Sequence, residues 1–245
     1  MITERLKQLT GHKFVYLTSR GDAAIKAALT NFRQVLIPEE GGWLSYKKFP
    51  HELVKCNDAK IDLEDLKNKV NTNTFDAFLY QNPGGYFAEQ PMKEIYEICK
   101  NKCKVVIDVS GSIGTILCDG KYADIFVGSF GRWKLVEAGE GGFISTNEIL
   151  EVNEITDKDL LEKIKIALVN LNGRINYLTE RRKRIINDLK DYNILFRDDL
   201  GFVVVIDGNE EKVINYCKMN NLEYTKCPRY IRVNKEAISI EVKRL

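Results

Sequence analysis

The chain has 245 residues, enough to bury the core of one large α/β domain or of a main domain with a smaller appendage. Its 37 basic residues nearly balance 35 acidic ones, and no long stretch carries one sign, which argues against a nucleic-acid or polyanion binder. The apolar runs, such as FVVVI at 202–206, are too short to span a bilayer. We therefore expect a soluble protein of the cytoplasm.

The first part of the chain alternates short apolar runs with helical patterns. The predicted strands are FVYL (14–17), VLI (35–37), DAFLY (76–80), VVIDVS (105–110) and DIFVGSF (124–130). Each run is rich in β-branched or aromatic residues, as buried parallel strands are. The predicted helices between them are GDAAIKAALTNF (21–32), DLEDLKNKV (62–70) and MKEIYEICKNK (92–102). This alternation predicts an α/β fold with a mostly parallel central sheet that is covered by helices.

The pattern changes after residue 155. Apolar residues at three- and four-residue steps predict one long helix that continues through RRKRIINDLK (181–190). The residues of this stripe are Leu161, Ile164, Leu168, Leu171, Ile175 and Leu178. The rest of the chain offers the strands FVVVID (202–207), YIRVN (230–234) and ISIE (238–241) and the helix EEKVINYCKMN (210–220). We predict a large domain over 1–155 and a small C-terminal α+β domain over 156–245.

Cysteine and histidine usage bears on metal binding. Six cysteines are scattered without a CxxC pair, and only two histidines accompany them. Reduced thiols in the core are the expected state, and no metal site is predicted.

Two segments at the predicted strand ends carry candidate binding groups, because open α/β sheets bind ligands there. The segment TSRGDAAIKAAL (18–29) places small and hydroxyl residues before a helix start, where free N–H groups bind an anion such as phosphate. An ordinary capped helix has the same pattern, so both interpretations remain open. Asp108 ends the VVID strand, where its carboxylate either faces the ligand crevice or caps the next turn.

A single lysine, Lys134, stands in the glycine-flanked segment GSFGRWKLVEAGEGG (128–142). A lysine that is desolvated at a strand end loses its proton more easily, and its free amine then condenses with an aldehyde to form a Schiff base. Lys134 is therefore a candidate nucleophile.

In their order and spacing these motifs resemble the fold-type-I pyridoxal-phosphate enzymes, and most closely the DegT/DnrJ/EryC1/StrS aminotransferases. The resemblance runs from about Lys13 to Asn147. Its most specific part is a serine–phenylalanine pair, a lysine five residues after that serine, and a GEGG run.

The resemblance implies roles for individual residues around pyridoxal 5'-phosphate. Lys134 would anchor the cofactor as a Schiff base and later act as the base, and Asp108 would keep the pyridine nitrogen protonated. Trp43 is the candidate to stack on the ring, but Tyr46 and Phe49 lie near it in the sequence, and any of the three could be ordinary core. The residues implied around the phosphate are Ser19, Arg20, Gly21, Asp22 and Ser129. Enzymes of this fold type generally build the site at a two-fold interface, so a homodimer is expected.

The chain also departs from the family pattern. Gly111 stands three residues after Asp108, where the family usually has glutamine, so one contact is missing or replaced. Family members are generally longer, which favours a small amine or amino acid over a sugar nucleotide as substrate. The segment PRYIRVN (228–234) resembles the arginine-bearing strand of amino-acid aminotransferases, which makes Arg232 a candidate carboxylate clamp; an exposed strand arginine without this role is the alternative.

Three functions remain in competition. The first is a pyridoxal-phosphate-dependent aminotransferase that acts on a small amine or amino acid. The second is another reaction on the same cofactor, by a lyase, desulfurase or aldolase. The third is a shortened scaffold without catalysis. The sequence leaves the amino donor, the acceptor and the pathway open.

Overall fold

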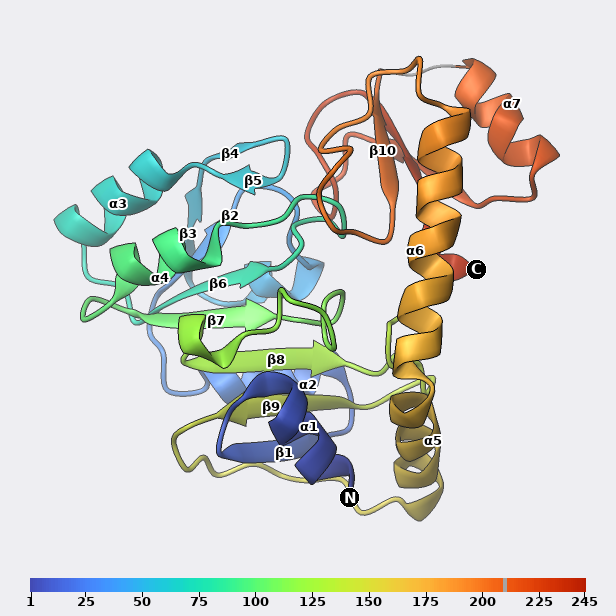
Figure 1. Ribbon diagram of the computed structural model, residues 1–245. Helices are drawn as coiled ribbons and strands as arrows, with labels where there is room; N and C mark the ends of the chain where they lie inside the picture. Colours follow the sequence, from blue (N-terminus) through green and yellow to red (C-terminus); the bar gives the residue numbers. More distant parts are fainter. Residues whose placement is uncertain (209–210) are drawn as a thin grey trace.

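The computed structural model describes residues 1–208 and 211–245. Within these residues, one sheet has seven strands in the order β1-β9-β8-β7-β6-β2-β3, and a smaller one has three in the order β10-β12-β11 (Figure 1). The strands of the large sheet are β1 (Phe14–Thr18), β2 (Val35–Pro38), β3 (His51–Val54), β6 (Ala77–Gln81), β7 (Lys104–Asp108), β8 (Ile125–Ser129) and β9 (Gly142–Thr146). A two-stranded hairpin consists of β4 (Cys56–Asn57) and β5 (Lys60–Ile61).

Most of the large sheet is parallel, as predicted. Strands β3, β2, β6, β7 and β8 pair in parallel. The prediction of a parallel partner is wrong for β1, because β1 pairs antiparallel with β9, a strand that the sequence analysis did not identify. Strand β9 also pairs antiparallel with β8, and its Gly142 lies opposite both Thr18 and Ser129. The carboxyl ends of β1 and β8 therefore flank the start of β9.

Helices cover both faces of this sheet because alternate strand residues point to opposite sides. Leu79 packs in one apolar cluster with Ile25 of α2, whereas its neighbour Phe78 packs in the other cluster with Ile95 of α4. The helices of this part are α1 (Ile2–Thr10), α2 (Gly21–Leu29), α3 (Leu63–Thr72) and α4 (Met92–Cys99). Short 3₁₀ turns lie at Leu44–Lys48 and Gly120–Tyr122.

The predicted long helix is two helices end to end, α5 (Lys158–Val169) and α6 (Leu171–Asp188). Asn170 ends the first and begins the second, with φ −84° and ψ −2°. Asparagine is a poor helix-interior residue because its side chain competes for backbone hydrogen bonds. The apolar stripe nevertheless continues across the break, since Ile164 and Leu171 are both fully buried.

The C-terminal part packs an antiparallel sheet against α6 and α7. Its elements are β10 (Val204–Asp207), α7 (Glu211–Met219), β11 (Tyr224–Cys227), β12 (Ala237–Ile240) and a 3₁₀ turn at Val242–Arg244. The predicted strand at 230–234 is wrong, because this segment turns back on itself: the N–H of Arg232 donates to the carbonyl of Arg229 at 2.8 Å. Glu210, the first residue of the predicted helix at 210–220, lies outside the described residues.

This turn docks on the carboxyl edge of the large sheet. The N–H of Gly41 donates to the carbonyl of Tyr230 at 2.7 Å. The buried Glu40 accepts from the N–H groups of Ala59, at 2.7 Å, and Asn234, at 2.5 Å, and its burial raises the pKa of that carboxyl group. Residues of the C-terminal part are thereby held over the strand ends.

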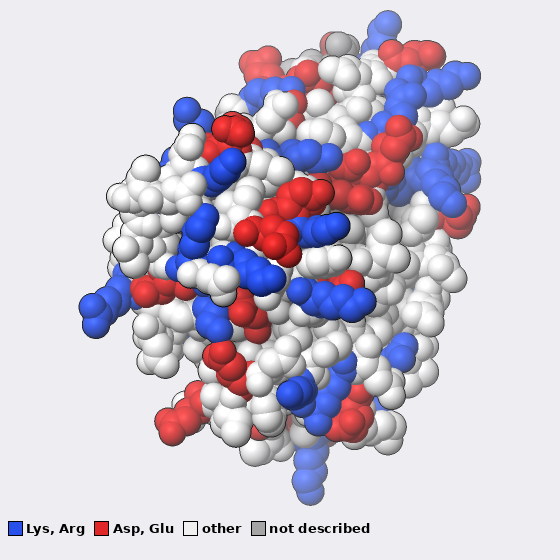
Figure 2. All heavy atoms as spheres, turned by 60° about the vertical axis from the view of Figure 1, so that its left-hand side comes forward, with Lys and Arg blue, Asp and Glu red and all other residues white. Residues whose placement is uncertain are grey.

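Charges on the face drawn in Figure 2 are mixed, with basic and acidic side chains interspersed. In the described part of the chain, no helix is long and apolar enough to cross a membrane. The described residues also contain no group of three His, Cys, Asp or Glu side chains arranged to hold a metal ion. All six cysteines are free.

Candidate active site

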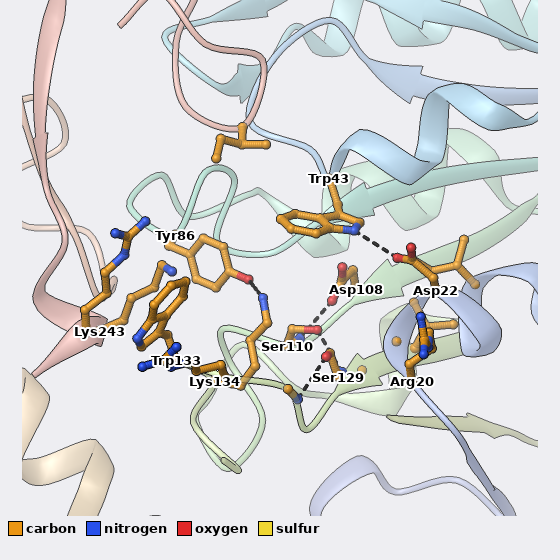
Figure 3. A pocket seen from close by; sticks show the side chains of 18 of the residues that line it. Arg20, Asp22, Trp43, Tyr86, Asp108, Ser110, Ser129, Trp133, Lys134 and Lys243 are labelled. Carbon is orange, nitrogen blue, oxygen red and sulfur yellow. Dashed lines mark hydrogen bonds between the residues drawn. The ribbon is translucent and has the colours of Figure 1, made fainter. Parts of the chain in front are cut away.

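A cavity of about 360 Å³ lies where the C-terminal residues meet the carboxyl ends of β1, β7 and β8. Its walls come from the start of α2, the ends of β7 and β8, the loop between β8 and β9, and two C-terminal segments. These two segments are the turn at 229–233 and the 3₁₀ turn at Val242–Arg244, which together we call the C-terminal turn. Figure 3 shows the principal side chains around this space. The predicted residues Asp108, Ser129 and Lys134 all line it.

Asp108 is 6% exposed at the end of β7. Its Oδ2 accepts from the hydroxyl of Tyr46 at 2.8 Å, and its Oδ1 accepts from the N–H of Ser110 at 2.9 Å. Burial, reinforced by the neighbouring Asp108, raises the pKa of Tyr46, so its hydroxyl remains a donor. Both donors are neutral, and such bonds fix the direction of a carboxylate without neutralising a charge. Asp108 is thus oriented for a cationic guest.

A chain of hydrogen bonds connects Asp108 to Ser129. The N–H of Ser129 donates to Oγ of Ser110 at 2.9 Å, and Oγ of Ser129 accepts from the N–H of Gly131 at 3.1 Å. Ser110, which stands two residues after the aspartate, was not predicted as a site residue from the sequence. These bonds position Ser129 and leave its own hydroxyl proton free to donate.

The N-terminus of α2 approaches Ser129 closely. A Cβ added to Gly21 would lie 2.7 Å from Cβ of Ser129, so only glycine fits there. Arg20, the N-cap residue, makes no side-chain capping bond. The first N–H groups of an α-helix have no partner within the helix, and they attract anions. Arg20, Gly21 and Asp22 line the cavity, and their role in holding a phosphate stays a prediction.

Ser19 lies outside the cavity, unlike Arg20, Gly21 and Asp22. It is exposed and is not among the residues that line the cavity. Its carbonyl accepts from the N–H of Gly141 at 3.0 Å and so connects the phosphate loop to the GEGG run. This bond supports the loop, and a contact of Ser19 with the cofactor stays a prediction.

Trp43 stands over the same space, in the segment between β2 and β3 (Figure 3). Its indole Nε1 donates to Oδ1 of Asp22 at 3.0 Å, and its ring centre lies 5.2 Å from Nζ of Lys134. The bond to Asp22 fixes the indole across the cavity. The prediction of a stacking platform is therefore compatible with its place.

Lys134 meets a residue that the sequence analysis missed, Tyr86. Nζ of Lys134 donates to the hydroxyl of Tyr86, and the two side chains meet inside the cavity (Figure 3). Trp133, directly before the lysine, has a positive φ of 64°, a conformation that non-glycine residues rarely adopt. Such strain is typical of functional sites. Tyr86 lies in the loop that follows the carboxyl end of β6. Open α/β sheets bind ligands at the carboxyl ends of their strands, so Tyr86 could have been predicted from its place after the strand at 76–80.

The ring of Tyr86 also explains why position 111 is a glycine and not the glutamine that is usual in the family. A Cβ added to Gly111 would lie 2.6 Å from Cδ1 of Tyr86. The ring thus occupies the space that a side chain at position 111 would need. Tyr86, from the loop after β6, therefore fills this space in the present chain.

Arg232 is not the free clamp that the sequence suggested. It is 2% exposed, and its guanidinium donates to Glu241 at 2.6 Å, to Oγ of Ser239 at 3.0 Å and to the carbonyl of Ile231 at 2.7 Å. Three of the five N–H groups of the guanidinium are engaged by these partners within the protein. Arg232 lines the cavity, but its partners are internal.

The C-terminal turn adds two further basic residues to this wall, Lys243 and Arg244. Lys243 is 7% exposed, and its Nζ lies 4.9 Å from the centre of the Tyr86 ring. The guanidinium of Arg244 lies 4.4 Å from the centre of the Trp133 ring. No local pattern marks these residues in the sequence, because only tertiary packing brings them to the cavity.

Arg174 of α6 ties this turn to the Lys134 loop. Its guanidinium donates to the carbonyl of Lys134 at 2.9 Å and to the carbonyl of Lys243 at 3.1 Å, and it pairs with Glu137 at 3.0 Å. One side chain therefore sets the relative position of the two cavity lysines.

Comparisons with known proteins agree with this geometry. The model of the DegT/DnrJ/EryC1/StrS aminotransferase family matches residues 53–159, a range that contains Asp108, Ser129 and Lys134. Among curated protein sequences, none matches the chain significantly. The predicted resemblance to this family, and to fold-type-I enzymes in general, is confirmed.

Solved structures share the fold at low sequence identity. The crystal structure of 3-amino-5-hydroxybenzoic acid synthase has a TM-score of 0.77 at 13% identity, and the match covers 99% of this chain and 84% of that one. A DegT DnrJ EryC1 StrS aminotransferase from Brucella abortus gives a TM-score of 0.77 at 12% identity, with 98% and 83% covered. A structure described as SPT with a PLP internal aldimine gives 0.72 at 13% identity, with 98% and 70% covered. The predicted fold class is confirmed.

Proposed function

We propose that this chain is a pyridoxal-phosphate-dependent aminotransferase for a small amine or amino acid, with Lys134 as the residue that carries the cofactor. The observation that supports this most is the convergence of Lys134, Asp108 and the open N-terminus of α2 on one cavity. The described residues that line the cavity include no cysteine or histidine, so nothing specific favours a desulfurase or a histidine-assisted lyase.

The residues present fit the cofactor. Asp108 is a buried carboxylate whose two partners are neutral, and this suits a protonated pyridine nitrogen. The α2 terminus and Ser129 form a cradle that one added Cβ at Gly21 would fill, and this suits a phosphate. Trp43 supplies an aromatic face whose position is fixed by its bond to Asp22.

Each residue then has a defined task. When bound, pyridoxal phosphate supplies an aromatic ring that accepts the electrons left when the substrate loses its α-proton. Nζ of Lys134 takes up that proton and returns it, and the hydroxyl of Tyr86 holds Nζ in position for the transfer. Asp108 keeps a positive charge on the ring nitrogen, and the indole of Trp43 excludes water from one face.

The decisive experiment locates the lysine that carries the cofactor. The cavity contains two lysines, Lys134 and Lys243, so the measurement must distinguish them. The purified protein is mixed with pyridoxal phosphate, reduced with borohydride and analysed by peptide mass mapping. We expect the adduct on the peptide that contains Lys134 and none in Lys134→Ala. An adduct on Lys243 instead, or no visible absorbance with excess cofactor, contradicts the proposal.

The dimer implied by the resemblance is part of this proposal. The cavity is open on one side, and a symmetric partner would close it and exclude water. Light scattering of the cofactor-loaded protein at micromolar concentration tests this, and an active monomer would rule the dimer out.

A further inference from the structure

We propose that Lys243 is the anchor for a carboxylate of the substrate, on the C-terminal wall of the same cavity. The inference rests on the proposed function, because it assigns the substrate group that faces away from the reacting amine. It replaces the clamp that the sequence analysis assigned to Arg232.

The first support is that Lys243 is buried without a partner of its own. The residue is 7% exposed and lines the cavity, and within the described residues its Nζ makes no hydrogen bond. The nearest carboxylate oxygen is Oε2 of Glu241, at 3.7 Å, and Arg232 already holds that oxygen at 2.6 Å. A buried ammonium group in this condition is costly to maintain, and such groups usually serve a ligand.

The other cations of this wall are already paired. Arg232 pairs with Glu241, and Arg244 pairs with Glu223 on the surface. Oε2 of Glu241 also lies 3.7 Å from Nζ of Lys243 and 3.7 Å from Nε of Arg244, so three cations share this one carboxylate, and Lys243 is the one without a hydrogen bond among the described residues. Its Nζ lies 4.9 Å from the ring centre of Tyr86 and 5.8 Å from that of Trp133, so two aromatic faces surround it. Figure 3 shows Lys134 at the hydroxyl end of Tyr86 and Lys243 on the other side of the ring.

The charges that face Lys243 determine its pKa and how that pKa changes when an anion binds. Burial lowers its pKa to about 7; Glu241 acts against this, and Arg232, Lys134 and Arg244 lower the pKa further. Tyr86 faces it through its ring. A bound carboxylate would favour the charged ammonium and raise the pKa again. Binding is therefore expected to draw a proton from solution above pH 7, in an amount that approaches one proton per site near pH 8.

The size of the cavity favours a small acid. Its volume of about 360 Å³ is near the lower limit of roughly 300–1,000 Å³ for small-molecule sites. Cofactor and substrate must share this space. An amino acid fits that condition better than a nucleotide sugar.

Calorimetry of glutarate, a dicarboxylate without an amino group, tests the inference. Glutarate is titrated into the cofactor-loaded protein at pH 6 and pH 8, in buffers of different ionisation enthalpy. At pH 8 we expect uptake of nearly one proton per glutarate and an affinity about tenfold weaker than at pH 6, because a group with pKa about 7 is then mostly neutral. At pH 6 the uptake should nearly vanish.

Two substitutions assign the proton to Lys243. Lys243→Gln should lower glutarate affinity at least tenfold at pH 6 and abolish the proton uptake at pH 8. Lys243→Arg should keep the affinity but lose its dependence on pH, because arginine stays charged throughout this range. Lys226→Gln, at an exposed position of β11, is the matched control and should change neither quantity.

The outcomes separate this inference from the proposed function. If the protein takes up no cofactor, the proposed function fails, but glutarate binding to the cofactor-free protein still reports on Lys243 through the same proton uptake. Glutarate binding that is insensitive to Lys243→Gln overturns the inference. So does a loss of cofactor affinity in that variant, which would place Lys243 in the phosphate site. A sensitivity seen only with a nucleotide diphosphate sugar overturns the choice of a carboxylate.

Discussion

The two walls of the cavity each contain one buried ionisable side chain, and these two side chains are of opposite sign. On the wall made by the large sheet, the buried carboxylate of Asp108 has only neutral partners. On the wall made by the C-terminal turn, the buried ammonium of Lys243 has no hydrogen bond from the described residues, and its nearest carboxylate is engaged by Arg232. Asp108 therefore has no cationic partner, and Lys243 has only a carboxylate that it shares with Arg232 and Arg244. The difference suggests a guest whose cationic part meets the sheet and whose anionic part meets the turn.

Arg232→Met should have the largest effect, and on stability rather than on substrate binding. Removal of the guanidinium leaves Glu241 buried beside fewer cations, and breaking a buried pair costs about 3–5 kcal/mol. Urea unfolding at pH 7 measures this loss. Arg229→Met, at an exposed position of the same segment, is the control and should stay within about 0.5 kcal/mol. A stable Arg232→Met protein that no longer responds to amino acids would restore the clamp expected from the sequence.

Asp108→Asn tests the role of the buried carboxylate on the wall made by the large sheet. The variant should still bind the cofactor, but turnover should fall by about 10²–10³, because a neutral amide cannot hold a positive charge on the ring nitrogen. Single-turnover rates with the best amine donor give the measurement. Asp62→Asn is a suitable control, since asparagine also caps the helix that Asp62 begins. Unchanged half-reaction rates in Asp108→Asn would reduce Asp108 to a structural group.

Lys243→Met should change stability in the opposite direction from Arg232→Met. The pKa of Lys243 is lowered from 10.5 to about 7 in the folded protein, chiefly by burial, so the unfolded chain binds its proton more tightly. The stability of the natural protein should therefore rise as the pH increases from about 7 toward 10.5. Lys243→Met should be more stable than the natural protein below pH 7, and this advantage should shrink by about 4 kcal/mol as the pH rises to about 10. Denaturant unfolding across this range measures it; a constant difference would show that Lys243 does not titrate.

Tyr86→Phe should have the smallest effect. It removes one hydrogen bond to Lys134 but keeps the aromatic ring that faces both Lys134 and Lys243. A bond of this kind contributes about 0.5–1.5 kcal/mol, which corresponds to a loss of roughly 2- to 12-fold in turnover. The pH dependence of the visible absorbance should shift as well, since Nζ of Lys134 loses a partner. Tyr16→Phe removes a hydroxyl that bonds Leu150 instead and serves as control.

The site residues that could be predicted from the sequence are those whose position depends on short motifs or on the end of a single strand. The strands that end at Asp108 and Ser129 are short apolar runs, and their carboxyl ends meet because the strands are parallel, so these residues were predictable. Lys134 was predictable because its flanking motifs have a fixed spacing. The residues around Lys243 were not, because their position depends on the docking of the C-terminal turn.

Two errors have a clear physical cause. The segment at 230–234 has the β-branched composition of a strand, but backbone bonds between Arg229 and its neighbours close a turn, and the buried pair of Arg232 and Glu241 stabilises it. Strand β9 was overlooked because GFIST follows a glycine run that is typical of a loop. Propensity carries no information about which strand such a segment pairs with.

The position of β9 has a kinetic consequence. This strand follows Lys134 in the chain, yet it is the partner of β1, which precedes the phosphate loop, and the two are far apart in sequence. Contacts of such long range form late, since the intervening chain must be ordered first. During refolding, the phosphate loop and the lysine loop should therefore acquire their final geometry in the same late event. Cofactor fluorescence should appear in the slowest refolding phase, after most secondary structure has formed.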